Sequence, residues 1–178
     1  MKSDVISIDK NGRFAGYASV FGQVDQGGDI VMAGAFKKSL AKKGAGNIRM
    51  LFQHDPKEPI GIWEKIVEDS FGLWAEGRLL PGIERSDSLR SLIEGKALDG
   101  LSIGFKAERA SKDKTSKHRR LWQINLWEIS IVTFPMMEGA RIISSVRMPD
   151  NDFRLAQSLD AAISLLKKPM KESPKNYG

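Results

Sequence analysis

The sequence of 178 residues contains no cysteine, and that absence excludes several kinds of site. Without cysteine the chain cannot form disulfides, thiolate metal centres or a cysteine nucleophile, which is consistent with a reducing cytosol. No apolar run approaches the roughly 18–20 residues that a membrane-spanning helix needs. The first residues also lack the apolar stretch of a secretory signal peptide. We therefore expect a protein that does not span a membrane.

Histidine is almost as scarce, since the chain has only two, His54 and His118. A mechanism that needs an unperturbed side chain titrating near neutrality must use one of them. The two are distant in sequence and no cysteine accompanies them, so they form no ligand pair at the spacing of a zinc site. Zinc-dependent hydrolysis is therefore disfavoured.

Acidic residues are fewer than lysines and arginines, and the formal net charge is +6. The excess is not one block but is spread over residues 37–43, residues 112–120 and the end of the chain from residue 167. We interpret it as a solvated basic surface, and we keep nucleic-acid binding as the less favoured alternative. The content of 41% hydrophobic and 28% charged residues is that of a soluble globular domain.

Hydrophobic periodicity predicts a body built mostly of strands, with two short helices. The predicted strands cover residues 13–21, 47–53, 60–68, 73–80, 101–109 and 121–134, and the predicted helices cover residues 33–43 and 86–94. For the second helix we expect Ser86 or Ser88 as N-cap and Gly95 at the exit. Turn residues predict a turn at 25–29 and an exposed loop at 111–117.

The strands occur in runs rather than in strict alternation with helices, which favours an antiparallel sheet or barrel in an α+β fold. We place a domain boundary near Pro149, so that residues 1–149 form the main domain and residues 150–178 a C-terminal segment. In that segment, residues 152–166 have the pattern of an amphipathic helix. The residues after it have the composition of a flexible tail.

Three scattered side chains could carry chemistry. His54 stands at the exit of a predicted strand, where reactive groups are often displayed. Ser102 lies on the opposite face of its strand from its apolar neighbours, beside Gly104, which leaves space for a substrate backbone. Glu128 lies in an apolar strand, where a carboxylate must face solvent or pair with a cation.

Together these residues supply the hydroxyl, imidazole and carboxylate of a serine protease. A serine hydroxyl becomes a strong nucleophile only when a base removes its proton, and imidazole can do this near pH 7. A carboxylate fixes the imidazole tautomer and stabilises the imidazolium. The three are far apart in the sequence, so the pattern alone leaves a structural role open for each of them.

Five short stretches follow one another in the order found in one known family. They are residues 16–21 (GYASVF), 28–31 with 34–36 (GDIV and GAF), 53–55 (QHD), 101–105 (LSIGF) and 127–135 (WEISIVTFP). With them the chain resembles the prohead proteases of tailed bacteriophages and gene transfer agents, which are distant relatives of the herpesvirus assemblins. The resemblance covers roughly residues 12–146.

The resemblance implies a mainly antiparallel, seven-stranded β-barrel flanked by short helices, with no metal or organic cofactor. It implies that Ser102 is the nucleophile, His54 the base and Glu128 the acid that orients the histidine, a place that a second histidine fills in assemblins. The implied activity is a serine endopeptidase that cleaves the scaffold or the major capsid protein precursor, and its own tail. It would act inside the assembling procapsid, in the cytoplasm of the bacterial host. Assemblins act as dimers, so a homodimer is also open.

The chain departs from the family after Pro135, where Ala-Asn-Pro often follows but MMEGAR stands at residues 136–141. Substrate contacts of that loop therefore do not carry over. Arg141 is a possible analogue of the late arginines near the assemblin oxyanion hole, but no motif supports it as a site residue. Two alternatives to an enzyme stay open: a non-enzymatic capsid assembly or scaffolding protein, and a nucleic-acid-binding domain. For the latter, His118 lies in the basic segment and is interpreted as a solvated loop residue.

Overall fold

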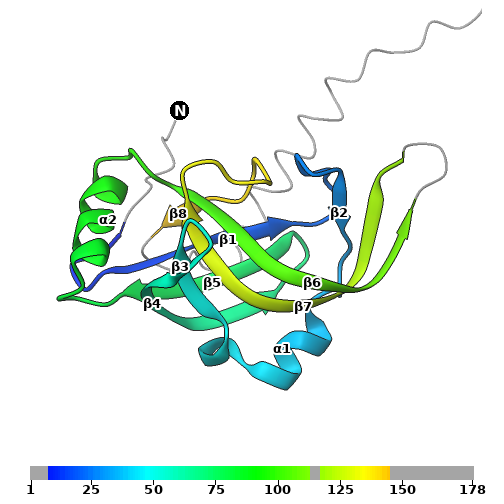
Figure 1. Ribbon diagram of the computed structural model, residues 1–178, viewed down its shortest axis with the longest axis horizontal. Coiled ribbons are helices and arrows are strands. Elements are labelled where there is room, and N and C mark those ends of the chain that lie inside the picture. The colour runs from blue at the N-terminus through cyan, green and yellow to red at the C-terminus, as the bar shows by residue number, and fades with distance from the viewer. Residues whose placement is uncertain (1–7, 113–116, 145–178) are drawn as a thin grey trace, which may run out of the picture. The chain divides into compact units, whose positions relative to one another are not determined.

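The computed structural model describes residues 8–112 and 117–144, which contain mostly strands and two α-helices (Figure 1). The elements are β1 (Arg13–Val20), β2 (Asp29–Val31), α1 (Lys37–Lys43), the 3₁₀ helix η1 (Ala45–Asn47), β3 (Arg49–Phe52), β4 (Asp55–Glu68), β5 (Gly72–Leu79), α2 (Glu84–Glu94), β6 (Gly100–Lys112), β7 (Arg119–Val132) and β8 (Ile142–Ser144). The six predicted strands and both predicted helices are present, with shifted ends. The sequence patterns missed β2 and β8.

The described residues form one mixed sheet of eight strands, in the order β2-β7-β3-β4-β5-β1-β8, with β6 paired to β7. The pairs β3–β4, β4–β5, β1–β5, β1–β8 and β6–β7 are antiparallel, whereas β2 and β3 both run parallel to β7. The sheet curls so that β6 and β7 cross over β1 and β5 (Figure 1). A single bridge between Gly100 and Arg141 links the start of β6 to the residue before β8.

The α+β class and the mainly antiparallel pairing are therefore right, but the predicted barrel of seven strands is wrong, because the sheet has eight strands and is mixed. The extra strands β2 and β8 have three residues each, too few to show an alternating pattern. The parallel pairs arise because β3 reaches β7 only after β4, β5 and β6 have intervened, so no tight hairpin imposes an antiparallel direction.

Strand β7 shows how the sequence builds the core. Its first half alternates, with Leu121, Ile124 and Leu126 buried between more exposed residues. Its last five residues are buried on both faces, so the polar side chains there are also enclosed. Each fully buried aliphatic side chain of this kind stabilises the fold by about 1.5–3 kcal/mol.

The N-cap of α2 differs from the prediction, whereas Gly95 ends the helix as predicted. Helix α2 begins after Ile83, which makes no side-chain cap, so neither Ser86 nor Ser88 is the N-cap. Both serines fall inside the helix: the Ser86 hydroxyl donates to the Ile60 carbonyl across the interface with β4, and that of Ser88 donates to the Glu84 carbonyl. The helix starts earlier because Glu84 and Asp87 both suit its first turn, where acidic residues are favourable.

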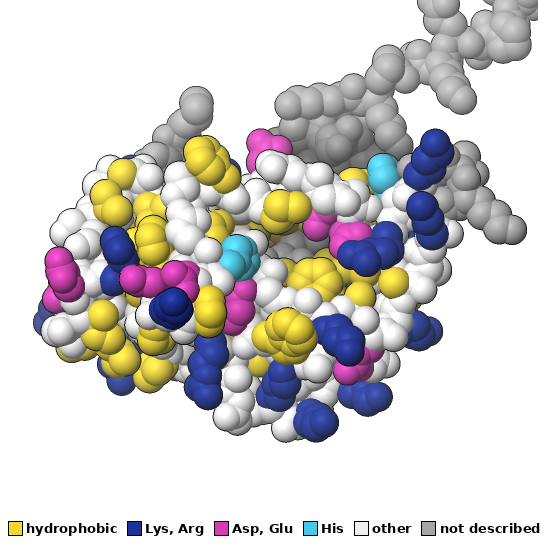
Figure 2. Space-filling view, viewed as in Figure 1, with side chains coloured by type: hydrophobic (Ala, Val, Ile, Leu, Met, Phe, Trp, Pro, Cys, Tyr) yellow, Lys and Arg dark blue, Asp and Glu magenta, His cyan; other side chains and the backbone are white. Residues whose placement is uncertain are grey.

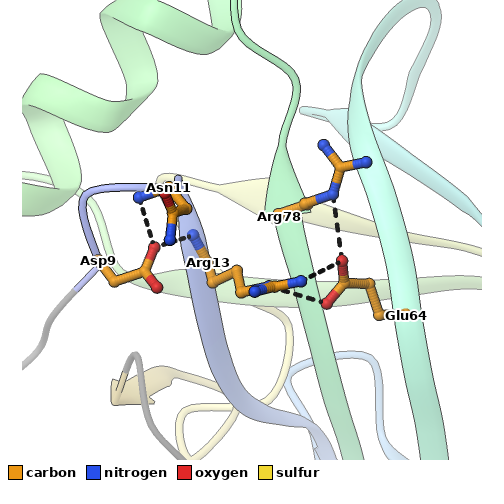
Figure 3. Close-up of polar contacts among 5 residues, drawn as sticks. All are labelled: Asp9, Asn11, Arg13, Glu64 and Arg78. Carbon is orange, nitrogen blue, oxygen red and sulfur yellow. Dashed lines mark hydrogen bonds and ion pairs between the residues drawn. The ribbon is translucent and has the colours of Figure 1, made fainter.

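An ion-pair network lies across β1, β4 and β5 on an exposed face (Figure 3). Glu64 of β4 accepts hydrogen bonds from Arg13 of β1 and from Arg78 of β5. These guanidinium groups, Arg13 first, hold the pKa of the Glu64 carboxyl below its usual value. At the start of β1, the Asp9 carboxylate accepts the backbone N–H groups of Asn11 and Arg13. The network supports strand register, and its exposure keeps its contribution to stability modest.

Lys and Arg side chains gather over α1 and along the β6–β7 hairpin (Figure 2). None of the helices within the described residues is long and apolar enough to span a membrane. Of the predicted loop at 111–117, the first two residues extend β6 and residues 113–116 lie outside the described residues. The boundary near Pro149, the helix at 152–166 and the tail also lie outside them.

Candidate active site

The fold brings together three side chains that are distant in sequence. The Nδ1 atom of His54 lies 2.6 Å from Oε1 of Glu128, and its Nε2 atom lies 3.0 Å from Oγ of Ser102. Each separation is a hydrogen bond, so the imidazole bridges the hydroxyl and the carboxylate. This is the arrangement in which a hydroxyl proton can pass to an imidazole that a carboxylate orients.

Pairing of β6 with β7 sets the position of two of these residues. Ser102 lies opposite Ser130, and Gly104 lies opposite Glu128. Because side chains two apart on a strand share a face, all four residues lie on one face of this hairpin. Ser102 and Glu128 are both buried, with exposed fractions of 4% and 9%.

Gly104 makes room for the carboxylate. A Cβ atom at this position would lie only 2.0 Å from Oε1 of Glu128, far inside van der Waals contact. Any larger residue would therefore push Glu128 away from His54. From the sequence we expected Gly104 to leave space for the substrate backbone. In the structure it leaves space for the carboxylate of Glu128 instead.

The histidine comes from the turn between β3 and β4. Gln53 and His54 both have left-handed backbones, with φ of 54° and 61°, which is unfavourable for two consecutive non-glycine residues. Three hydrogen bonds to the end of β7 and the residue after it hold the turn in this form. They run from Gln53 N to the Ile131 carbonyl (3.0 Å), from Gln53 Nε2 to Thr133 Oγ1 (2.7 Å) and from His54 N to Ser130 Oγ (3.1 Å).

The carboxylate also sets the electrostatics of the imidazole. The hydrogen bond to Glu128 raises the pKa of His54 above the ordinary 6.5, and the Coulombic attraction adds to it, although burial opposes both. Since the folded pKa is the higher one, the pairing contributes stability that is fully present below pH 6.5. That stability is lost as the pH rises through the folded pKa.

An NMR titration can test this pKa. The imidazole C–H signal of His54 should titrate with a midpoint above 6.5, and Glu128→Gln should bring the midpoint below that of the parent, because burial then acts without the charge. The chain has one other histidine, so a His118→Gln variant assigns the signals. A midpoint that is the same with and without the carboxylate would contradict the pairing in solution.

A small pocket of about 130 Å³ opens beside Ser102. Its walls are mostly apolar and come from the start of β6, the end of β1, the β2 segment and the loop after β7. The lining includes Met136 and Met137, which stand where the family pattern has Ala-Asn. A bidentate ion pair between Asp29 of β2 and Arg119 of β7 holds the β2 wall in place. The pocket can receive one side chain of a bound peptide.

Arg141 is engaged elsewhere in the fold. Its guanidinium donates to the Asp99 carboxylate at 2.5 Å and to the Glu138 carbonyl at 3.0 Å. These bonds give it a structural role in the loop before β8. Within residues 8–112 and 117–144, no group of three or more His, Asp or Glu side chains could hold a metal ion.

Sequence reasoning missed the residues that support this site, namely Ser130, Gln53 and Thr133. Ser130 and Thr133 lie in the stretch WEISIVTFP, and Gln53 directly precedes His54. The only signal was their adjacency to residues already singled out, because serine, glutamine and threonine carry no periodic pattern.

Comparison with known proteins gives one family. A family model described as caudovirus prohead serine protease matches residues 2–152. The prohead protease of Enterobacteria phage HK97 is 38% identical over 135 residues, which is 75% of this chain and 60% of that protein. The prohead protease of Escherichia phage T5 is 28% identical over 162 residues, which is 90% of this chain and 75% of that protein. The chain thus spans less than two thirds of the HK97 protein.

Solved structures show the same fold at low identity. The capsid assembly protease of bacteriophage T4 superposes with a TM-score of 0.58 at 14% identity, covering 69% of this chain and 82% of that one. The KSHV protease, solved with a hexapeptide phosphonate inhibitor, gives a TM-score of 0.50 at 14% identity, covering 91% of this chain and 82% of that one. At these identities the likeness concerns the fold alone.

Proposed function

Because the chain belongs to the caudovirus prohead serine protease family, we propose that it is a serine endopeptidase that acts in capsid maturation. The observation that carries this is the continuous hydrogen-bond path from Ser102 Oγ through the His54 ring to Glu128, at 3.0 and 2.6 Å. This path uses one of the two histidines of the chain, His54.

In this mechanism His54 Nε2 takes the hydroxyl proton as Ser102 Oγ attacks the peptide carbonyl carbon. The negative carboxylate of Glu128 stabilises the imidazolium that forms. The tetrahedral intermediate collapses, its C–N bond breaks, and His54 gives the proton to the leaving amine. A water molecule, deprotonated by the same nitrogen, then cleaves the acyl ester and restores the serine.

The free edge of β6 offers a site for the substrate backbone. Leu101 N donates to the Ala140 carbonyl on that edge, so the N–H and C=O groups of Ile103, two residues on and before the irregularity at Gly104/Phe105, also point away from β7. No described strand covers this edge beyond Ser102. An extended peptide can add there as a strand, with one side chain in the pocket lined by Met136 and Met137.

The proposed substrates are the scaffold or the major capsid protein precursor, and the chain's own C-terminal segment. The relatives named above are prohead and capsid assembly proteases, which supports this choice and the expectation that the reaction takes place inside the assembling procapsid in the bacterial cytoplasm. A homodimer is part of the expectation that follows from the assemblin-like fold. Sedimentation velocity at the assay concentration tests it.

Covalent labelling tests the proposed function directly. An aryl peptidyl phosphonate should modify the wild-type chain at a single position, and peptide mass spectrometry should place the adduct on Ser102. In parallel, incubation with capsid precursor should yield discrete fragments. A chain that folds, takes no label and leaves the precursor intact would instead be an assembly factor that keeps the fold without turnover.

A further inference from the structure

Ser130 is the most deeply enclosed polar residue next to the catalytic path, with an exposed fraction of 0%. It lies on β7 two residues after Glu128, so both side chains point to the same face of the strand. Across the hairpin it faces Ser102, and on the other side of β7 it pairs with Leu51 of β3. It therefore lies on the strand that carries the acid, between the strand that carries the nucleophile and the strand that leads to the base.

The Ser130 hydroxyl makes two hydrogen bonds that link the acid to the base. Its Oγ donates to Oε2 of Glu128 at 2.7 Å, and the same oxygen accepts the backbone N–H of His54 at 3.1 Å. A hydroxyl has one donor and two acceptor sites, so both bonds can form together. Of the residues the structure describes, Ser130 alone is bonded to both Glu128 and His54 without belonging to the path itself.

The first bond fixes the carboxylate. Oε1 of Glu128 is bonded to the His54 ring, and Ser130 is the described residue that donates a hydrogen bond to Oε2. Oε1 itself lies in the space that a Cβ atom at position 104 would occupy, 2.0 Å from it, so no side chain at that position holds the carboxylate. The bonds from His54 and Ser130, one to each oxygen, therefore resist rotation of the carboxylate about its last torsion.

The second bond fixes the histidine backbone. His54 has a left-handed conformation, and its N–H is not paired in the sheet. Ser130 satisfies this N–H in a partly buried position, where an unpaired donor would be less favourable. One hydroxyl thus controls both the orientation of the carboxylate and the direction from which the imidazole enters the site.

We propose that Ser130 is a positioning residue for catalysis, which aligns Glu128 and His54 with each other and makes no hydrogen bond to Ser102. This role rests on the proposed protease function. It goes beyond the three-residue path, because it assigns part of the catalytic rate to a fourth side chain, whose hydroxyl touches neither substrate nor the reacting oxygen.

Replacing Ser130 with alanine tests the role. We expect kcat to fall by about 10- to 100-fold, as a small misplacement of reacting groups can cause, with KM changed by less than about twofold. Ser86→Ala is the matched control, since Ser86 is also a buried serine with a backbone hydrogen bond, made to the Ile60 carbonyl away from the site. That control should lower the melting temperature and leave kcat within about twofold of the parent.

A double-mutant cycle separates positioning from general damage. In a Glu128→Ala background, Ser130→Ala should cost no more than about threefold in kcat, because the bond to Glu128 is already gone and only the bond to the His54 N–H remains to be lost. If Ser130→Ala fails to fold, Ser130→Cys replaces it. The thiol is close in size but a weak donor and acceptor, so the same fall in kcat is expected.

Three outcomes would overturn the role. Ser130→Ala could have the same kcat as Ser86→Ala, or it could change KM alone, or it could lower kcat by the same factor with and without Glu128. These are distinguishable from failure of the protease function itself. In that case Ser102→Ala would match the parent, and the parent would cleave no precursor. With a serine-dependent parent, the cycle reports on Ser130 alone.

Discussion

Ser102→Ala is expected to lower kcat/KM for precursor cleavage by about 10⁴- to 10⁶-fold while the chain stays folded. Loss of the nucleophile or the base from a hydroxyl–imidazole–carboxylate triad removes the covalent route entirely. Deletion of such residues lowers the rate by factors of this size. His54→Ala should give a similar loss, since the only other histidine is elsewhere. Both are measured by single-turnover cleavage of purified precursor, with circular dichroism to confirm folding.

A matched serine on the same strand provides the control. Ser111 lies near the far end of β6, is exposed and accepts a hydrogen bond from Trp122. Ser111→Ala should cleave the precursor at the parent's rate. Full activity of Ser102→Ala would falsify the assignment of the nucleophile, and loss of activity in both variants would point to damage of β6 instead.

Gly104→Ala is the second substitution for which we expect a large loss of activity. The added methyl group would lie 2.0 Å from Oε1 of Glu128, so the carboxylate must leave the His54 ring. We expect kcat to fall by about 10²- to 10³-fold, because a misplaced acid no longer holds the imidazole. Melting should show a loss of about 1–3 kcal/mol, the usual cost of overpacking. The imidazole titration described above should also move to lower pH.

Gly46→Ala is its control, because a Cβ atom there meets nothing within 4 Å and the backbone is not left-handed. It should leave kcat, stability and the His54 titration near their parental values. If Gly104→Ala also left kcat unchanged, the approach of Glu128 to β6 would have to differ in solution from the one described.

Much of the strand framework could be predicted, because β1, β4, β5, β6 and β7 are long enough for their burial pattern to repeat. The direction and the pairing partners of the strands could not be predicted. Alternation in β3 indicates that one face is buried, but not that β3 pairs with β7 in parallel. The N-cap of α2 was misplaced because serine suits both a cap and an early helical position.

The site divides in the same way. Ser102, His54 and Glu128 were found through motif order, which carries information that a single strand pattern lacks. The purpose of Gly104 appears only when β6 is aligned with β7, and the contact of Ser130 with His54 only when the turn after β3 is placed against β7. Both contacts join segments that are distant in sequence, so they leave no periodic pattern.

The parallel pairing of β3 with β7 has a consequence for the order of events during synthesis. The ribosome produces the base first, then the nucleophile, and last the strand that lies between them and joins them into one surface. Until β7 has emerged and inserted between its two neighbours, the reacting groups have nothing to hold them in contact. A chain that stopped before Arg119 would carry both reacting residues, and we expect it to cleave nothing, because β7 is made after both of them.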